Sequence, residues 1–538
     1  MLHSFTRYVV SNISLPFNAS FEEAFSVARA RLNKLGIKGK DLQFSVYRRS
    51  VDARKKNDIR FVYSILVTGV LPELNTVKLQ QNNITVEQVS APDISFGNER
   101  CMGRPVVVGT GPCGLFCALL LAENGFRPIL LERGGAVKER KDAIESFKRT
   151  RILDVNSNIQ FGAGGAGTFS DGKLVTRIND DLSSFVIDKL IEFGAPKEIS
   201  YLARPHVGTD ILMDVVDKAI NKICELGGEV RYHTTFLGYE STNGKIRAVK
   251  TDNGDIACSD LVLAIGHSAR ETYAELLNSG VAIEAKSFSV GMRIEHPVSL
   301  IDTAMYGENA GNPILGHAEY NLSYNTKQRG VYTFCMCPGG VVVAATSECG
   351  GVVSNGMSYH ARDGKNSNSA VCCTVFKDDY GNTPLGAIEY QRKIERAAFI
   401  AGGSDYSAPI ITVGDFLNGR CVSDPTDVLP TYMDGNGVKL ARPEEYLPSI
   451  VTDNIKCALV DFDRKIAGFA SDSTLLTGAE TRTSAPVRIT RDNITRTAIG
   501  FSNLYPAGEG AGYAGGITSA AIDGVKTAIK IISKYQKN

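Results

Sequence analysis

Tryptophan is absent from this chain of 538 residues, and so are several features that would assign it to a specialised class of protein. Nowhere do about 18 apolar residues follow one another, so we expect no membrane-spanning helix. The start, MLHSFTRYVVSN, has no uninterrupted apolar stretch, and we expect a cytoplasmic protein without a secretion signal. Lys and Arg total 59 against 58 Asp and Glu, and a net charge of +1 gives no general attraction for nucleic acid or anionic membranes.

Regular cysteine spacing is also missing. The 12 cysteines form no CxxC pair, and the pattern is not that of a disulfide scaffold, so we expect reduced thiols. The segment CMC at 335–337 and the adjacent Cys372 and Cys373 have poor spacing for zinc. No metal site is therefore predicted.

The most informative segment that is present covers residues 104–134, RPVVVGTGPCGLFCALLLAENGFRPILLERG. It reads as an apolar strand at 105–108, a glycine-rich turn, a helix that ends at Gly125, and a second apolar strand at 129–131. An acid, Glu132, follows that strand. This order of elements is the dinucleotide-binding pattern, whereas the glycines alone would be weak evidence in a chain that has 53 of them.

The glycines and the acid of that pattern each have a physical task. Gly109 permits the tight turn, Gly111 lets a pyrophosphate approach the backbone beside Pro112, and Gly114 lets helix and strand pack closely. The pyrophosphate would lie at the positive N-terminus of the helix. Glu132 would accept hydrogen bonds from a ribose diol.

Two later segments indicate which dinucleotide is bound. Residues 503–532, NLYPAGEGAGYAGGITSAAIDGVKTAIKII, resemble the C-terminal flavin signature of the glutathione-reductase-type FAD fold, with Glu509 where that fold usually has Asp. The resemblance implies that Gly508, Glu509, Gly516 and Ile517 contact the flavin end. LVLAIGHSA at 261–269 resembles the strand-and-glycine segment before the flavin, which implies a contact at Gly266. We therefore expect non-covalent FAD, with NAD(P)H at most a transient electron donor.

The pattern of elements predicts an α/β protein with a divided FAD-binding Rossmann domain, an inserted α+β substrate domain and a small N-terminal α+β domain. In the small domain we expect strands at 8–13, 42–49 and 59–67 and a helix at 21–35. A helix at 210–226 and a strand at 229–236 should return to the Rossmann sheet and place Thr235 and Phe236 near the adenine. The inserted domain should contain strands at 330–335 and 341–346 and helices at 385–401 and 447–469. The predicted domain limits are 1–95, 100–285, 286–489 and 490–538.

Four further segments extend the resemblance to nearly the whole chain. They are GAGGAGTFSDGKL (162–174), MCPGG (336–340), NGMSYHARDGKNSNSA (355–370) and TGAETRTSAPVRI (477–489). They resemble bacterial FAD-dependent dehydrogenases, often labelled NAD(FAD)-utilising. Disulfide reductases of the related fold carry a CxxxxC pair after the nucleotide motif. Here Cys113 and Cys117 lie four residues apart within the predicted helix, so such a reductase is not expected.

Several side chains are candidates for contacts with the flavin or the phosphates. Gly164, Gly165 and Gly167 would offer backbone donors, and Lys173 would place a cation beside the flavin N1–C2=O edge, the alternative being a solvated surface lysine. Arg133 and Arg140 would pair with pyrophosphate or ribose, or else lie solvated on the surface.

The candidates for chemistry leave alternatives open. His267 would shuttle protons near the flavin or serve as a satisfied loop histidine. Alternation places Glu480, Arg482 and Ser484 on one face, as an anion site or with a structural ion pair between the first two. Cys335 and Cys337 would share a face, either as reactive thiols or as small buried residues.

The function predicted from these patterns is an FAD-dependent oxidoreductase that transfers a hydride between flavin N5 and a small or medium organic substrate. One alternative is a polyprenyl-type C=C reductase, which a large apolar tunnel would favour. Another is an RNA-binding flavoprotein that docks through the basic segment RRSVDARKK at 48–56. Nucleic-acid binding is not favoured, because this segment lacks interleaved aromatics. The sequence does not indicate the oligomeric state.

Overall fold

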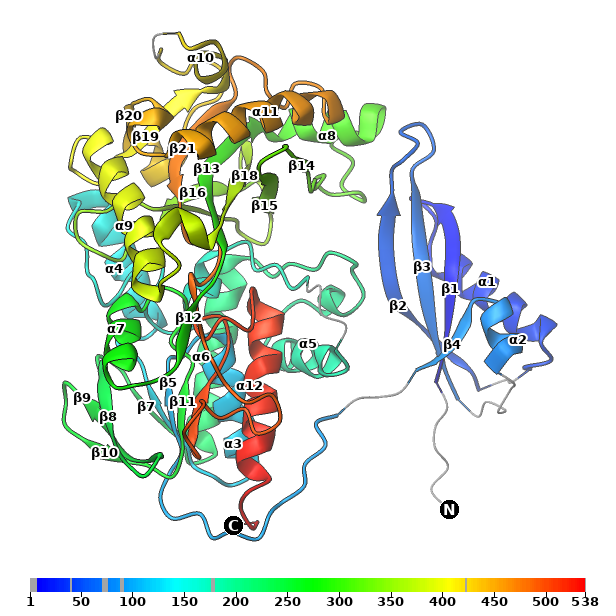
Figure 1. The fold of residues 1–538 in the computed structure, drawn as a ribbon. Helices are drawn as coiled ribbons and strands as arrows, with labels where there is room; N and C mark the ends of the chain where they lie inside the picture. Colours follow the sequence, from blue (N-terminus) through cyan, green and yellow to red (C-terminus); the bar gives the residue numbers. More distant parts are fainter. Residues whose placement is uncertain are drawn as a thin grey trace.

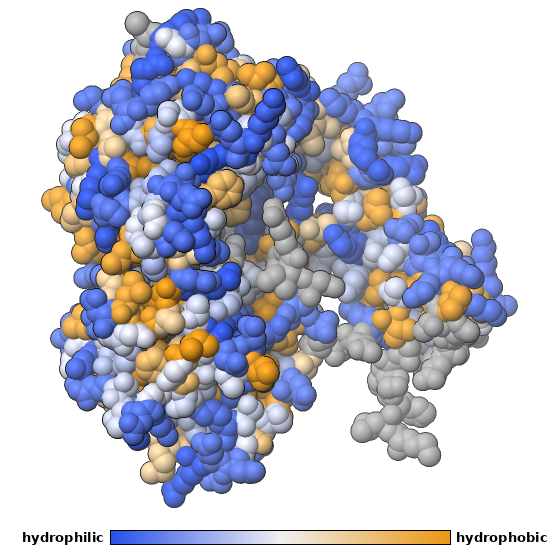
Figure 2. Space-filling model, in the orientation of Figure 1, coloured by the Kyte–Doolittle hydropathy of each residue, from blue (hydrophilic) through white to orange (hydrophobic). Residues whose placement is uncertain are grey.

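The computed structural model of the protein describes residues 7–38, 41–69, 76–87, 91–175, 180–420 and 423–537. These residues form a small N-terminal unit and a larger body with two lobes (Figure 1). Within these ranges no helix is long and apolar enough to span a bilayer. On the face drawn in Figure 2, hydrophobic residues are interspersed among hydrophilic ones.

The N-terminal unit is a four-stranded antiparallel sheet with the order β2-β3-β1-β4. Its long helix begins at a capping box, in which the Ser20 backbone N–H donates to Glu23 at 2.7 Å. Alternate residues of the central strand are buried, as expected for a sheet with one covered face. The elements are β1 (Arg7–Pro16), α1 (Phe21–Lys34), β2 (Gln43–Asp52), β3 (Arg60–Thr68), α2 (Thr76–Gln81) and β4 (Ile84–Glu87).

This unit contacts the body through Arg49 of β2. The Arg49 backbone N–H donates to Tyr201 at 2.7 Å, and the Arg49 carbonyl accepts from Ala203 at 2.9 Å. The Arg49 guanidinium also lies over the rings of Phe61 and Tyr201, 4.7 and 5.7 Å from their centroids. The edge of β2 is therefore hydrogen-bonded to the loop that leads to Arg204. Arg204 is one of the residues that line the cavity described below.

The first lobe contains a five-stranded parallel sheet with the order β23-β11-β5-β6-β7. Each strand has three residues, and alternate side chains enter two different cores, so both faces are apolar. The helices α3 and α12 pack against each other on one face (Figure 1). The strands are β5 (Val106–Val108), β6 (Ile129–Leu131), β7 (Glu229–Arg231), β11 (Leu261–Leu263) and β23 (Leu504–Pro506).

The remaining elements of this lobe surround the parallel sheet. Its helices are α3 (Pro112–Glu123), α4 (Val137–Thr150), η1 (Ala166–Phe169), α5 (Leu182–Glu192), η2 (Lys197–Ser200), α6 (Thr209–Glu225), α7 (Arg270–Asn278) and α12 (Ile517–Ile532). A separate antiparallel sheet covers the second face with β8 (Phe236–Thr242), β9 (Lys245–Thr251) and β10 (Ile256–Ala257).

The second lobe is built on a seven-stranded sheet with the order β14-β15-β18-β13-β21-β19-β20. The chain enters it after β12 (Ile283–Ala285) and leaves through β22 (Val487–Ile489), which pair with each other. The strands of this lobe are β13 (Phe288–Pro297), β14 (Ser323–Asn325), β15 (Gly330–Cys337), β16 (Val341–Ala344), β17 (Ser354–Met357), β18 (Asn366–Val375), β19 (Ala408–Thr412), β20 (Val438–Leu440) and β21 (Leu475–Glu480). Of these, β16 and β17 form a separate two-stranded sheet. Its helices are α8 (Val298–Tyr306), η3 (Gly307–Asn309), η4 (Lys377–Tyr380), α9 (Pro384–Ala401), α10 (Val413–Asn418), η5 (Tyr432–Gly435), η6 (Pro443–Glu445) and α11 (Ser449–Lys465).

The α/β fold class predicted from the sequence is confirmed, and the largest departures from the predicted extents are at 229–236 and 447–469. The strand expected at 229–236 is divided between β7 and β8, which belong to different sheets. The helix expected at 447–469 ends at Lys465, where Ile466 adopts an extended conformation. After β7 the apolar pattern continues because Phe236 is buried in a different core, and after α11 it continues because Ile466 and Phe469 are buried in the same core as the helix.

Candidate functional site

A cavity of about 510 Å³ lies where the carboxyl ends of the parallel strands face the seven-stranded sheet. Its lining comes from the glycine turn after β5, the loop before α5, the segment after β11, the N-terminus of α12, and β15 and β21. Ligand sites of parallel α/β sheets lie at this edge. The cavity is therefore the candidate functional site.

The glycine turn has the geometry that a pyrophosphate requires. A Cβ on Gly109, which has φ +100°, would stand 2.3 Å from the Ala264 carbonyl oxygen. A Cβ on Gly114 would stand 1.9 Å from the Gly109 carbonyl oxygen. On Gly111, by contrast, the nearest atom would be Cα of Gly165 at 3.8 Å, so this position faces open space in the cavity. Gly109 and Gly114 shape the turn, and Gly111 leaves room for the phosphates at the N-terminus of α3.

Glu132 lies at this edge of the cavity, but its carboxylate already binds four donors of the protein. It accepts from the Thr110 backbone N–H at 3.2 Å and hydroxyl at 2.5 Å, and from the N–H groups of Gly134 and Gly162 at 3.0 and 2.9 Å. The acid thus ties the glycine turn to two neighbouring loops. A ribose contact at Glu132 stays a prediction, and a diol would have to share these oxygens.

Both predictions for Arg140, a contact with pyrophosphate or ribose and a solvated position on the surface, are wrong. Its side chain is fully buried and donates to five backbone carbonyls between Asn158 and Gly165. Burial lowers the pKa of Arg140 to about 9. It neither lines the cavity nor faces solvent, because it organises the loop from inside. Arg133 does line the cavity, over the Phe161 ring and paired with Glu271.

Of the three glycines predicted to contact the cofactor in the loop before α5, two face the cavity and one faces α6. Gly165 and Gly167 line the cavity as predicted for a cofactor contact. Gly164 does not, because a Cβ there would meet Thr168 and, at 2.8 Å, Val216 of α6. The prediction for Gly164 is therefore wrong, and its lack of a side chain serves helix packing.

The C-terminal segment shows a similar division. Glu509, Gly516 and Ile517 line the cavity, whereas Gly508 packs against the Cys113 side chain, and its predicted cofactor contact is wrong. No hydrogen-bond partner of the Glu509 carboxylate is found among the described residues. Burial raises the pKa of Glu509 to about 7, although Lys286 opposes the shift. This carboxyl group is available to a ligand.

The remaining positions predicted for the cofactor, Pro112, Phe236 and Gly266, also line the cavity, as does Thr235. Phe236 and Thr235 come from the start of β8 and Gly266 from the turn after β11. The cavity thus extends from the residues expected near the adenine to those expected near the flavin.

Lys173 lines the cavity and belongs to a cluster of charged side chains. Its ammonium lies 3.1 Å from Glu319 and 3.4 Å from Asp171, and Arg362 binds both of these carboxylates. Although burial opposes the charged forms, Lys173 and Arg362 lower the pKa of Asp171 to about 2, and the two acids raise the pKa of Lys173. Lys173 is therefore a fixed cation and not a solvated surface residue. Glu319 and Arg362 lie far along the chain from Lys173, so local spacing does not predict that they meet it.

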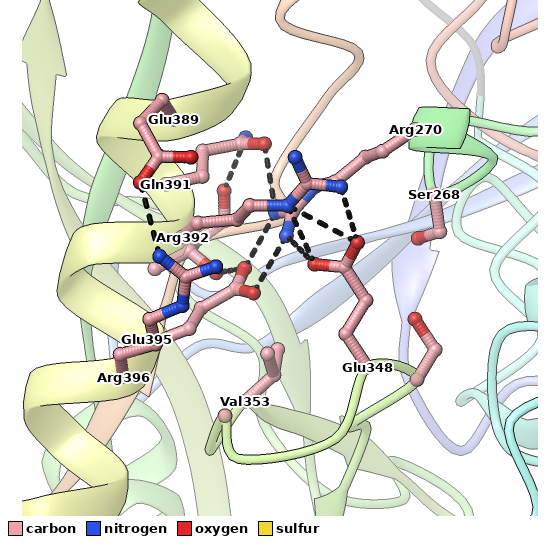
Figure 3. A network of polar contacts seen from close by, with 12 residues as sticks. Ser268, Arg270, Glu348, Val353, Glu389, Gln391, Arg392, Glu395 and Arg396 are labelled. Atoms are coloured by element: carbon pink, nitrogen blue, oxygen red, sulfur yellow. Dashed lines mark hydrogen bonds and ion pairs between the residues drawn. The ribbon is translucent and has the colours of Figure 1, made fainter. Parts of the chain in front are cut away.

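Arg482 also lines the cavity and is held by Glu395, a residue of the network of Figure 3. Its guanidinium donates to Glu395 at 3.2 and 3.1 Å and to Ser347 at 2.5 Å. Arg270 binds the same Glu395 carboxylate at 2.8 and 2.7 Å and also contacts Glu348 (Figure 3). The predicted ion pair between Glu480 and Arg482 is wrong, because Glu480 binds Arg293 at 3.2 Å.

His267 also lines the cavity, beside this network. Burial, Arg482 and Arg270 lower the pKa of His267 to about 3. This shift favours the neutral imidazole near pH 7, and a role of His267 in moving protons near the flavin stays a prediction. Ser484 does not line the cavity, because β21 ends at Glu480 and the alternation does not continue.

Cys335 lines the cavity at an irregularity in β15. The pairing with β18 shifts register between Phe334 and Cys337, and Cys335 has φ +49°. Cys337 is fully buried beneath it. The simple alternation expected for the two cysteines is interrupted by this bulge, which aims Cys335 at the cavity.

The described residues contain no group of three or more His, Cys, Asp or Glu side chains arranged to hold a metal ion.

Comparison with known proteins adds a family. A curated protein of Clostridium beijerinckii, described as uncharacterized, is 45% identical over 524 residues, which is 96% of this chain and 98% of that protein. Residues 287–483 match a family model described as "FAD-dependent protein, C-terminal domain-like", and residues 9–68 match a domain of unknown function, DUF8436.

Solved structures resemble the chain only distantly. L-amino acid deaminase from Proteus vulgaris is 12% identical with a TM-score of 0.34, covering 83% of this chain and 97% of that one. A geranylgeranyl bacteriochlorophyll reductase-like protein of Thermoplasma acidophilum is 12% identical with a TM-score of 0.33, covering 80% and 79%. At these scores the likeness supports no statement about the reaction.

Proposed function

This chain belongs to the family that includes the Clostridium beijerinckii protein, its cofactor is FAD, and we propose that it is a dehydrogenase that oxidises a small or medium organic substrate. The observation that carries the proposal is one cavity that joins the open glycine turn at Gly111 to a wall of charged side chains from the second lobe. When bound, FAD supplies the two-electron chemistry by accepting a hydride at N5.

The residues that would hold the cofactor follow from the lining. The N-terminus of α3 at Gly111 would bind the pyrophosphate, and the edge with Glu132 and Phe236 would receive the adenosine. Glu509 and the N-terminus of α12 at Gly516 would face the ribityl chain and the flavin. Positions 515 and 516 support this role, because a Cβ at either would meet no atom within 4 Å.

The chain's own charges would orient the substrate. Lys173, Glu319 and Arg482 all line the cavity. The network around Arg482 holds three guanidinium groups, those of Arg270, Arg392 and Arg482, against the two carboxylates of Glu348 and Glu395, so the cations exceed the acids by one and repel one another. An anionic group in the cavity would relieve this repulsion, and we therefore propose a substrate that carries a carboxylate or a similar anion.

The two alternative functions are less well supported by the side chains. Polyprenyl reduction needs an apolar tunnel, whereas Lys173, Glu319, Glu480 and Arg482 line this cavity. For the RNA alternative, two arginines of the basic segment at 48–56 already have partners within the protein. Arg49 lies over an aromatic ring, and Arg54 pairs with Asp52 at 2.6 Å.

The test is an anaerobic screen of the FAD-loaded protein. Candidate anionic metabolites, neutral analogues, NADH and NADPH are added in turn, and bleaching of the flavin absorbance is followed. We expect bleaching by an anionic substrate and its loss in Arg482→Met. A protein that cannot be loaded with FAD, or that releases FMN on heating, would contradict the proposal.

A further inference from the structure

The described cysteines differ sharply in their surroundings. Cys113, Cys117 and Cys372 are buried, and burial raises the pKa of each thiol. Cys335 instead lines the cavity that would hold the flavin, whereas Cys337 is fully buried and its thiol donates to the Cys335 backbone carbonyl at 3.4 Å. These two thiols are separated by a single residue, and a bulge brings them out of simple alternation.

The side chain of Arg293 contacts both residues of this pair. Its guanidinium donates to the Cys335 carbonyl at 2.8 Å and lies 3.7 Å from the Cys337 sulfur. The same side chain is fully buried and bound to Glu480 and Asn368, so its position is fixed. A fixed cation beside a thiol pair favours a thiolate.

The thiols also interact with each other. A hydrogen bond from the Cys337 thiol lowers the pKa of Cys335, and although burial opposes this, Arg293 and Lys173 lower it further. The same hydrogen bond, together with burial, raises the pKa of Cys337. The directions of these shifts make Cys335, which lines the cavity, the more acidic thiol of the pair and Cys337 the less acidic one, and thiol–disulfide exchange begins with attack by the more readily ionised thiol.

From this placement we propose that Cys335 and Cys337 form a redox-active pair whose disulfide takes the electron pair that substrate oxidation leaves on the flavin. The inference rests on the proposed function, because the flavin is the source of the electrons. It adds a class of final acceptor, a low-molecular-weight disulfide.

The Cys335–Cys337 disulfide would accept two electrons and one proton, which reduced FAD would supply. Its S–S bond would break to give the Cys335 thiolate and the Cys337 thiol. Cys335 then attacks the external disulfide and releases one thiolate. Cys337 attacks the mixed disulfide, releases the second thiolate and loses its proton to solvent, which restores the Cys335–Cys337 bond.

The decisive experiment is an anaerobic reductive titration of the FAD-loaded protein after mild oxidation with diamide. We expect the wild type to take up one more electron pair than Cys335→Ser or Cys337→Ser. Cys457→Ser is the control, since Cys457 is exposed on α11, and it should behave like the wild type. Equal uptake by the wild type and Cys335→Ser would overturn the inference while leaving the flavin function intact.

A second measurement does not depend on bound flavin. Mass spectrometry of the diamide-treated protein should find a disulfide between Cys335 and Cys337, and the rate of Cys335 alkylation by iodoacetamide should rise at a lower pH than for Cys457. If FAD does not bind, the proposed function fails, and these two readouts still decide whether the thiols pair. Two free thiols after diamide treatment would reject the pair.

Discussion

Arg482 and Arg270 share one buried carboxylate, that of Glu395, although the three residues come from the end of β21, the start of α7 and the middle of α9. Burial opposes ionisation, but the two guanidinium groups hold the pKa of Glu395 well below its usual range. Glu395 thus fixes the cation that lines the cavity.

Glu395→Ala should destabilise the protein strongly, because it leaves two buried guanidinium groups without this counter-charge. We expect a loss of about 3–5 kcal/mol in the free energy of unfolding, measured by urea denaturation. Glu389→Ala is the matched control on the same helix, where the pair with Arg396 is exposed, and its effect should be about 0–1 kcal/mol. Similar effects of the two changes would show that the network of Figure 3 is not a buried unit.

Gly111→Val should abolish FAD binding without unfolding the protein. Gly111 has φ −68°, which valine adopts readily, and its Cβ would point into the cavity where the phosphates are expected. The measurement is the flavin absorbance of the purified variant, with circular dichroism as the check on folding. A yellow, folded Gly111→Val protein would place the cofactor elsewhere.

Lys173→Met should lower the flavin midpoint potential, since the ammonium would stabilise the anionic reduced flavin. One lost charge-assisted contact of about 2 kcal/mol corresponds to roughly 40 mV for a two-electron couple. Lys138→Met is the control, because Lys138 is exposed and pairs with the exposed Asp142. An unchanged potential would assign Lys173 to the charge cluster with Asp171 and Glu319 alone.

Glu509→Gln should change the pH dependence of stability of the FAD-free protein. The raised pKa, about 7 in the folded state, means that the native carboxyl group keeps its proton while the unfolded one loses it, so stability falls as the pH rises from about 4.5 to 7. The glutamine variant should be more stable than the wild type at pH 8, by about 2 kcal/mol after allowance for solvent in the cavity, and equal to it near pH 4. Thermal unfolding at the two pH values measures the difference, and an equal gain at both would assign it to packing.

Removal of residues 1–90 should leave a folded protein that binds FAD, because every residue of the glycine turn and the flavin end lies beyond this point. The body would lose the contact of Arg49 with the loop at 201–203, which leads to Arg204 at the cavity rim. We therefore expect a higher KM for the substrate with FAD affinity unchanged, measured by steady-state kinetics and flavin titration. Loss of soluble protein would show that the N-terminal unit is part of the core of the body.

The sequence by itself determined the glycine turn and the two helix N-termini, because these depend on spacing within a few residues, whereas FAD was indicated by the resemblance of residues 503–532 to a flavin signature. The roles of Gly109, Gly111 and Gly114 follow from backbone geometry that any strand–turn–helix imposes. The fold class follows in the same way from the periodicity of apolar residues.

Only the tertiary structure decided the partners of the charged residues. Glu480 and Arg482 are neighbours in sequence, yet they bind Arg293 and Glu395, which approach from other strands and helices. Arg140 follows the nucleotide motif closely but turns inward to a loop that local pattern does not place. A charge selects its partner according to distance and burial in space, and neither is encoded in local spacing.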